Sequence, residues 1–151
     1  MAAMNYRIPG LLSISMVFIA FAITGYQLFI SSVLVGILYV LLFPVVFLNL
    51  LYFYCRKCPH VTDNSCRHVI FGPIVKKLFR LEKPSPYKIS EIFLALFPFV
   101  LYILFFQYWL FQNTYLLTTF WILMLTAGVM IRLGVCTKCK NTYCPGCNSP
   151  K

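Results

Sequence analysis

Long apolar stretches alternate with short polar segments along the chain. Four stretches, residues 11–30, 33–53, 92–111 and 115–131, contain no Asp, Glu, Lys, Arg or His. The length of each stretch is close to that of a helix that crosses a hydrocarbon core of about 30 Å, which needs about 20 residues. The pattern therefore predicts an all-α integral membrane protein with four transmembrane helices.

The links between these stretches predict how the helices are paired. Little more than Ser31 and Ser32 separates the first two stretches, and residues 112–114 separate the last two. Links this short are typical of antiparallel neighbours, so we expect two helical hairpins. The chain then divides into a first transmembrane hairpin, a Cys/His-rich loop, a second transmembrane hairpin and a Cys-rich tail, at residues 1–54, 55–90, 91–135 and 136–151.

Composition and charge agree with a membrane location and predict its orientation. Of the 151 residues, 61% are hydrophobic and 11% are charged, whereas a soluble domain has about 25% charged residues. All 13 Lys and Arg residues lie before the first stretch, between the second and third, or after the fourth. Because basic flanks are retained in the cytoplasm, the N-terminus, the central loop and the C-terminus are expected there. The net charge of +10 then indicates contact with anionic lipid headgroups and not with nucleic acid.

The strongest chemical signal is the tail. Cys136 and Cys139 form one C-x-x-C pair, and Cys144 and Cys147 form a second. Two such turns complete a tetrahedral Cys₄ shell, which favours zinc. The spacing of Cys139, Cys144 and Cys147 also resembles the local run of plant-type [2Fe–2S] ferredoxins, so an iron–sulfur cluster is the alternative cofactor.

A second cluster follows the second apolar stretch. Cys55, Cys58 and Cys66 can form a Cys₃His shell with one of two histidines, His60 or His68. We favour His68, because it follows Cys66 as the second half of a knuckle would, whereas His60 lies close behind Cys58. Cytoplasmic thiols are kept reduced, so metal ligation or thiol chemistry is expected here and not disulfides. The loop and the tail are too short to bury a core, and a metal would supply the missing stability.

The loop also contains a short helical pattern. Residues 73–80 predict a basic amphipathic helix that starts at Pro73 and lies in the headgroup layer or against a metal site. Its apolar stripe consists of Ile74, Val75, Leu78 and Phe79. Farther along, Ser90 is expected to cap the third transmembrane helix, with Glu91 in the first turn.

The polar residues inside the apolar stretches carry no charge. This argues against an ion pump or a proton-coupled transporter, because such proteins use ionisable groups inside the membrane. Pro44 and Pro98 are expected to kink two helices and adjust their packing. The remaining polar side chains are expected to form interhelical hydrogen bonds; they are Ser13, Ser15, Asn49, Gln107, Thr118, Thr119 and Thr126.

Three functions follow from these features. The first is a small non-enzymatic membrane subunit whose metal-bound clusters shape a docking surface for other membrane or cytoplasmic subunits, or for copies of itself. The second is an iron–sulfur subunit that passes electrons between a cytoplasmic donor and a quinone or a partner. The third is a membrane thiol oxidoreductase, because four spans with C-x-x-C pairs resemble the architecture of the oxidoreductases related to vitamin K epoxide reductase. Here, however, every cysteine lies on the basic side of the predicted membrane.

Overall fold

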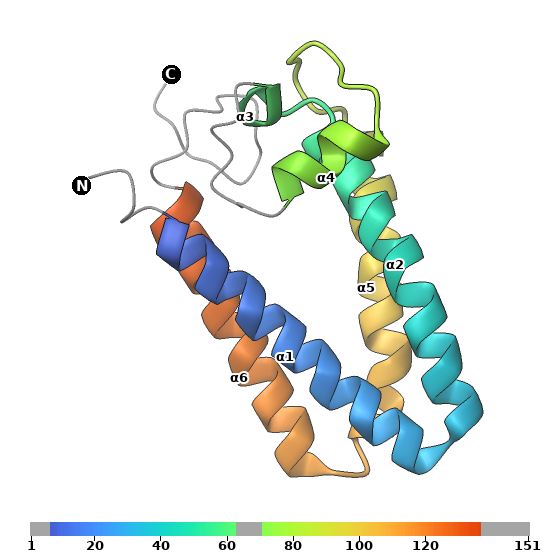
Figure 1. Ribbon diagram of the computed structural model, residues 1–151. Coiled ribbons are helices and arrows are strands. Elements are labelled where there is room, and N and C mark those ends of the chain that lie inside the picture. Colours follow the sequence, from blue (N-terminus) through green and yellow to red (C-terminus); the bar gives the residue numbers. More distant parts are fainter. Residues whose placement is uncertain (1–6, 63–70, 137–151) are drawn as a thin grey trace.

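The computed structural model describes residues 7–62 and 71–136, and this part of the chain is helical throughout, apart from its connecting segments (Figure 1). A π-helical segment, η2 (Ile131–Val135), prolongs the last long helix. The α-helices are α1 (Arg7–Ser31), α2 (Val33–Cys55), α3 (Pro59–Thr62), α4 (Phe71–Leu78), α5 (Ile89–Leu110) and α6 (Thr114–Met130).

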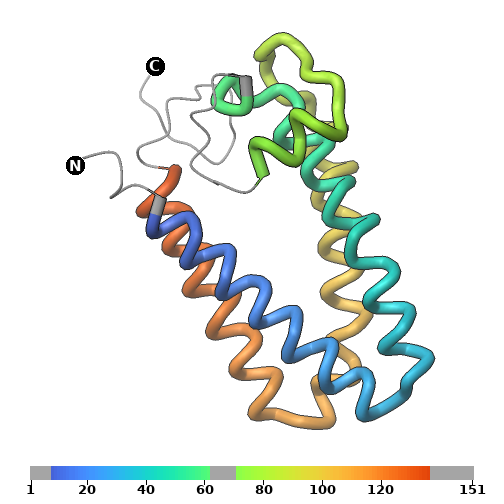
Figure 2. Tube along the Cα trace, viewed as in Figure 1, coloured from blue at the N-terminus to red at the C-terminus, as the bar shows by residue number. Residues whose placement is uncertain are grey.

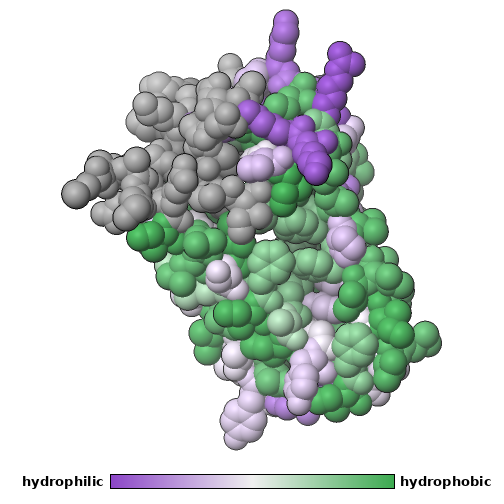
Figure 3. Space-filling view, viewed as in Figure 1, coloured by the Kyte–Doolittle hydropathy of each residue, from purple (hydrophilic) through white to green (hydrophobic). Residues whose placement is uncertain are grey.

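Four helices in the described part are long and apolar enough to cross a membrane. They comprise residues Ile8–Ser31, Val33–Cys55, Ile89–Leu110 and Thr114–Val135. Hydrophobic side chains cover their outer faces, and strongly hydrophilic side chains gather around α4 (Figure 3). Apolar residues exposed on this scale need a lipid solvent. The four-span prediction is therefore confirmed, and the chain has the structure of a multi-pass membrane protein.

The long helices are arranged as two pairs that diverge. Helix α1 lies along α6, and α2 lies along α5 (Figures 1 and 2). The pairs meet near the links at Ser32 and at residues 111–113. The two pairs separate toward the opposite end of the molecule, where α1 and α5 begin and α2 and η2 end. Helices α3 and α4 also lie at this end, which we call the cap end.

Two compact hairpins would pair α1 with α2 and α5 with α6 most closely, and the observed packing differs from that. Contacts between α1 and α6 are the most extensive in the described part, and those between α5 and α6 are sparse. Small residues explain the α1–α6 pairing: Ala20 is fully buried and clusters with Phe120 and Leu110, and Ala127 of α6 is also fully buried. Small side chains let two helices approach closely in a membrane, where apolar area alone does not drive association.

Two tyrosines connect three helices where the pairs meet. The Tyr39 hydroxyl of α2 donates to the Phe21 carbonyl of α1 at 3.0 Å. The Tyr102 hydroxyl of α5 donates to the Tyr39 carbonyl, also at 3.0 Å. The two tyrosine rings stack with centroids 5.1 Å apart. The result is a buried hydrogen-bonded chain from α5 through α2 to α1.

Most of the intramembrane hydroxyl groups do not link helices. Ser15, Thr118 and Thr119 donate to carbonyls four residues earlier in their own helices, at 3.0, 2.8 and 2.8 Å. Ser13 donates to the Pro9 carbonyl in the same way. The prediction of interhelical bonds is wrong for these four residues, because a helical Ser or Thr reaches the carbonyl of its preceding turn without a partner helix.

Asn49 confirms the prediction of an interhelical bond, and a proline explains its partner. Pro98 has no N–H, so the Leu94 carbonyl four residues earlier loses its donor within α5. The Asn49 side-chain amide of α2 donates to that carbonyl at 2.9 Å. The asparagine thus satisfies a group that the proline leaves exposed inside the membrane.

We predict that Asn49 and Pro98 are energetically coupled. Asn49→Leu should lower the free energy of unfolding by about 1 kcal/mol, because the Leu94 carbonyl then lacks a donor. In a Pro98→Ala background the backbone N–H of residue 98 can donate to the Leu94 carbonyl. The loss of stability caused by Asn49→Leu should therefore be markedly smaller in that background. Unfolding in mixed detergent micelles measures this double-mutant cycle. Pro44→Ala provides the control cycle, and equal coupling of Asn49 to both prolines would contradict this explanation.

Candidate functional site

A small hydrophobic cluster fastens α3 and α4 to the end of α2. Leu51, Val61 and Val75 are buried at its centre. Helix α4 is amphipathic as predicted, but it already includes Phe71, so Pro73 is not its first residue. Leu78, assigned to the apolar stripe, is 55% exposed. The helix therefore packs against protein with one face and presents the other outward.

The first C-x-x-C pair forms a single tight turn beside this cluster. The Cys58 amide donates to the Cys55 carbonyl at 3.1 Å, and the Val61 amide donates to the Cys58 carbonyl at the same distance. Both cysteines are half-buried and pack against the cluster around Val75. The two cysteines of the pair are thus held at the two ends of one turn.

Cys136 lies at the same end of the molecule. It follows η2 directly and is half-buried. Close packing holds the preceding turn, because a Cβ atom added to Gly134 would come within 2.8 Å of the Pro9 Cβ atom of α1. Each half of the described chain thus has two spans and leads directly into a C-x-x-C motif.

The other predicted ligands lie outside the described residues. Within residues 7–62 and 71–136, no group of three or more His, Cys, Asp or Glu side chains is arranged to hold a metal ion. Both metal clusters therefore remain predictions. The ligands outside the described part are Cys66, His68, Cys139, Cys144 and Cys147.

A charged cluster lies beside the Cys55–Cys58 turn. Lys57 is only 9% exposed, and its ammonium group lies 2.5 Å from Glu91 Oε1 and 4.0 Å from Glu82 Oε2. Arg56 lies 3.0 Å from Glu82 Oε1 and stacks over the Tyr52 ring at 4.1 Å. The cluster places two cations and two carboxylates where the apolar part of α2 ends.

The same contacts hold the segment between α4 and α5 in place. The Glu82 amide donates to the Arg56 carbonyl at 3.2 Å, and the Tyr87 hydroxyl donates to the Tyr54 carbonyl at 2.6 Å. Glu91 Oε2 also accepts from the Lys88 amide at 2.9 Å. The first-turn position of Glu91 is therefore confirmed, whereas the predicted cap at Ser90 is wrong, because Lys88 occupies the cap position.

Sequence reasoning missed this charged cluster. The basic residues were interpreted through membrane topology, contact with lipid headgroups and one amphipathic helix, and no carboxylate partner was assigned to any of them. The available signal was the scarcity of acid: the whole chain contains only three Asp and Glu residues against 13 Lys and Arg. A rare carboxylate beside a span is a strong candidate for an ion pair with a cation close to the membrane.

Comparisons with protein-family models, with curated proteins and with solved structures gave no match to this chain.

Proposed function

We propose that the protein is a small non-enzymatic membrane subunit whose Cys/His clusters bind zinc and shape a docking surface for a membrane complex. The observation that carries the proposal is the common location of the described cysteines. Cys55, Cys58 and Cys136 each adjoin the end of a membrane-crossing helix at the cap end. Metal knuckles built from them would join the two diverging helix pairs to one compact surface.

The packing around the first pair supports a structural role for the metal. Cys55 and Cys58 contact a hydrophobic cluster with only three buried residues among those described, which is a small core for α3 and α4 to depend on. Small polypeptide units usually need a metal or another cross-link to stay folded. A Cys₃His site completed by Cys66 and His68, and a Cys₄ site completed by Cys139, Cys144 and Cys147, would supply that stability.

The orientation is part of the proposal. We place the cap end in the cytoplasm, because basic residues next to membrane spans are retained there. Arg56, Lys57 and Lys88 flank spans at this end, and Arg132 lies in the last turn of the fourth span. In this orientation both clusters meet a reducing compartment, which keeps thiolates available for zinc, and the docking surface faces cytoplasmic or neighbouring membrane subunits.

Elemental analysis tests the cofactor. The full chain, purified without oxygen, is expected to contain about two zinc ions and to be colourless, one ion for each four-ligand cluster. The double variant Cys55→Ser/Cys58→Ser should lose about one of them, and Cys136→Ser/Cys139→Ser should lose the other. Iron with acid-labile sulfide and visible absorption would overturn the zinc assignment and establish the electron-transfer alternative.

The docking function has its own test. A subunit bound through the cap end should be cross-linked to the chain in native membranes and released when both clusters are emptied by a chelator. If the protein has lost its zinc and the cross-linking is the same before and after metal removal, the docking function is contradicted. The existence of the metal sites would not be affected by that result.

A further inference from the structure

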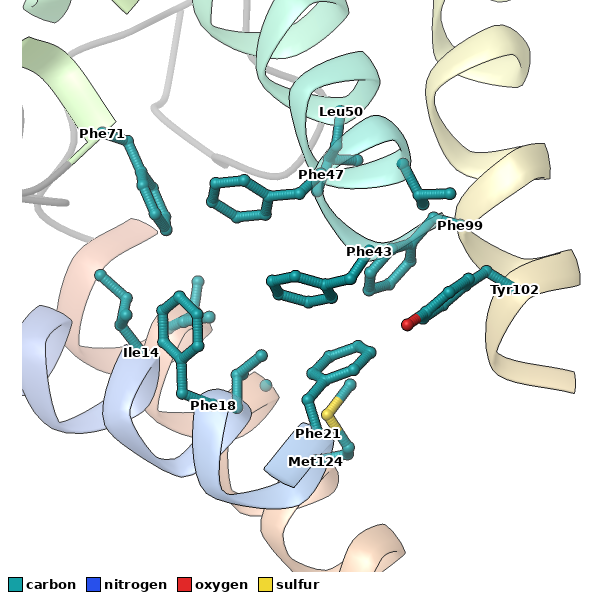
Figure 4. Close-up of a pocket in the computed structure, with 14 residues that line it drawn as sticks. Ile14, Phe18, Phe21, Phe43, Phe47, Leu50, Phe71, Phe99, Tyr102 and Met124 are labelled. Atoms are coloured by element: carbon teal, nitrogen blue, oxygen red, sulfur yellow. The ribbon is translucent and has the colours of Figure 1, made fainter. Parts of the chain in front are cut away.

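A groove separates the two helix pairs on the side of the cap end. It has a volume of about 270 Å³ and is partly open to the surroundings. An apolar cavity of roughly 150 Å³ is already large enough to hold a benzene-sized molecule. Aromatic side chains from four helices line it (Figure 4): Phe18, Phe21, Phe43, Phe47, Phe71 and Phe99.

The described lining of the groove offers no free polar side chain to a ligand. Among the described lining residues no side chain is charged, and Tyr102 carries the only hydroxyl. That hydroxyl already donates to the Tyr39 carbonyl. The groove also lies along spans that the bilayer surrounds, where hydrocarbon is the available solvent. The chemistry of this surface therefore selects a hydrocarbon chain.

Helix α4 contributes one residue, Phe71, to the lining of the groove and also presents cations. Phe71, at the start of α4, faces the groove and packs edge-on against Phe47 with ring centroids 5.3 Å apart. Lys77, on the same helix, and Arg80, just beyond it, are both exposed. One short helix thus combines an aromatic contact inside the groove with positive charge at the membrane surface.

Among the described residues, cations outnumber carboxylates at this end. Glu82 and Glu91 are the acidic residues of the described chain, and both are paired with Arg56 or Lys57. The ion pairs of these two carboxylates therefore do not include Lys77 or Arg80. An anionic group at the membrane surface would complement them.

We propose that the groove binds one hydrocarbon chain of an anionic phospholipid from the surrounding bilayer, with its headgroup at Lys77 and Arg80. The groove suits a flexible chain better than a partner helix, because the two helix pairs converge toward the turns while a helix has a fixed diameter of about 10 Å. The bound chain fills the space between the pairs and stabilises their separation at the cap end. This proposal is independent of metal binding.

Gly128 of α6 provides a direct test. It lines the groove, and a Cβ atom added to it would meet nothing within 4 Å. Wild-type protein and Gly128→Phe are reconstituted in vesicles of equal phosphatidylglycerol and phosphatidylcholine, then extracted in mild detergent. Mass spectrometry of the purified protein counts retained phospholipid per chain. Wild type should retain phosphatidylglycerol in preference, and Gly128→Phe should retain roughly tenfold less.

Matched variants separate the groove from the outer surface. Val129, the next residue of α6, is 56% exposed, so Val129→Phe adds the same ring outside the groove and should leave retention unchanged. Lys77→Gln should keep the lipid but reduce the preference for phosphatidylglycerol by up to roughly fivefold. Gly128→Leu, with a smaller side chain, guards against a folding defect in Gly128→Phe, and thermal melting checks both variants.

Three results would overturn the proposal. Equal retention by folded Gly128→Phe, Gly128→Leu and Val129→Phe would show that the lipid lies elsewhere on the protein. Retention of a neutral isoprenoid or quinone in place of phospholipid, in protein extracted from native membranes, would assign the groove to a different ligand. Wild-type protein that keeps no phospholipid under these conditions would show that the groove does not hold a lipid chain.

Discussion

Tyr39→Ala is expected to be among the most destabilising single substitutions in the membrane-spanning part, lowering the free energy of unfolding by about 3–5 kcal/mol. Tyr39 is buried, stacks on Tyr102 and packs edge-on against Phe106 with centroids 4.9 Å apart. Its hydroxyl and carbonyl both take part in the hydrogen-bonded chain across three helices. Removing the ring therefore leaves a cavity at the point where the two helix pairs meet.

Conservative variants separate the ring from its hydroxyl. Tyr39→Phe and Tyr102→Phe each remove one interhelical hydrogen bond and should lower stability by about 1 kcal/mol. Unfolding in micelles of increasing sodium dodecyl sulfate fraction measures all three variants on one scale. Tyr26→Ala is the matched control, because Tyr26 is 65% exposed, and it should change stability by less than about 0.5 kcal/mol. A loss in Tyr39→Ala no larger than in this control would contradict the role assigned to the tyrosines.

The spans were predictable because their signal is compositional. Stretches free of charge, each near the length of a bilayer, required nothing but the local sequence. The structure extends the third span back to Ile89, because Glu91 is paired with Lys57 and also caps the helix. A charged residue ended the predicted stretch, but its ion pair lets the helix begin earlier.

The pairing of helices was less predictable, because link length does not determine it. A one-residue link at Ser32 keeps two helix ends together but leaves their far ends free to separate. Fully buried small residues such as Ala20 and Ala127 decide which helix lies alongside. These alanines are indistinguishable in sequence from Ala22, which is exposed to the membrane.

The tyrosine chain was missed for a related reason. Sequence reasoning assigned the interhelical hydrogen bonds to Ser, Thr, Asn and Gln side chains and named no tyrosine among them. A mid-span tyrosine can also form such a bond, because its ring packs as an apolar group and its hydroxyl reaches a neighbouring backbone. Which tyrosine does so depends on the crossing of α1, α2 and α5, which only the folded chain defines.

Glu91→Gln should have the largest effect among substitutions in the charged cluster, lowering the free energy of unfolding by on the order of 2 kcal/mol. Lys57 is almost fully buried, and Glu91 is its nearest carboxylate. Removing one partner leaves a buried cation with only Glu82, 4.0 Å away. Glutamine still accepts a hydrogen bond at this position of the helix, so the cap on Lys88 is retained and the change isolates the charge.

The two carboxylates of the cluster give a comparison under identical conditions. Glu82→Gln acts on a side chain that is 44% exposed, and its pair with Arg56 should contribute about 0.5 kcal/mol or less. The double variant Lys57→Met/Glu91→Gln should recover much of the loss, because no buried charge then lacks a partner. Detergent unfolding of the four proteins measures the difference. If Glu91→Gln and Glu82→Gln lowered the free energy of unfolding by the same small amount, the burial of Lys57 would have no energetic consequence. The cluster would then behave as a surface ion pair.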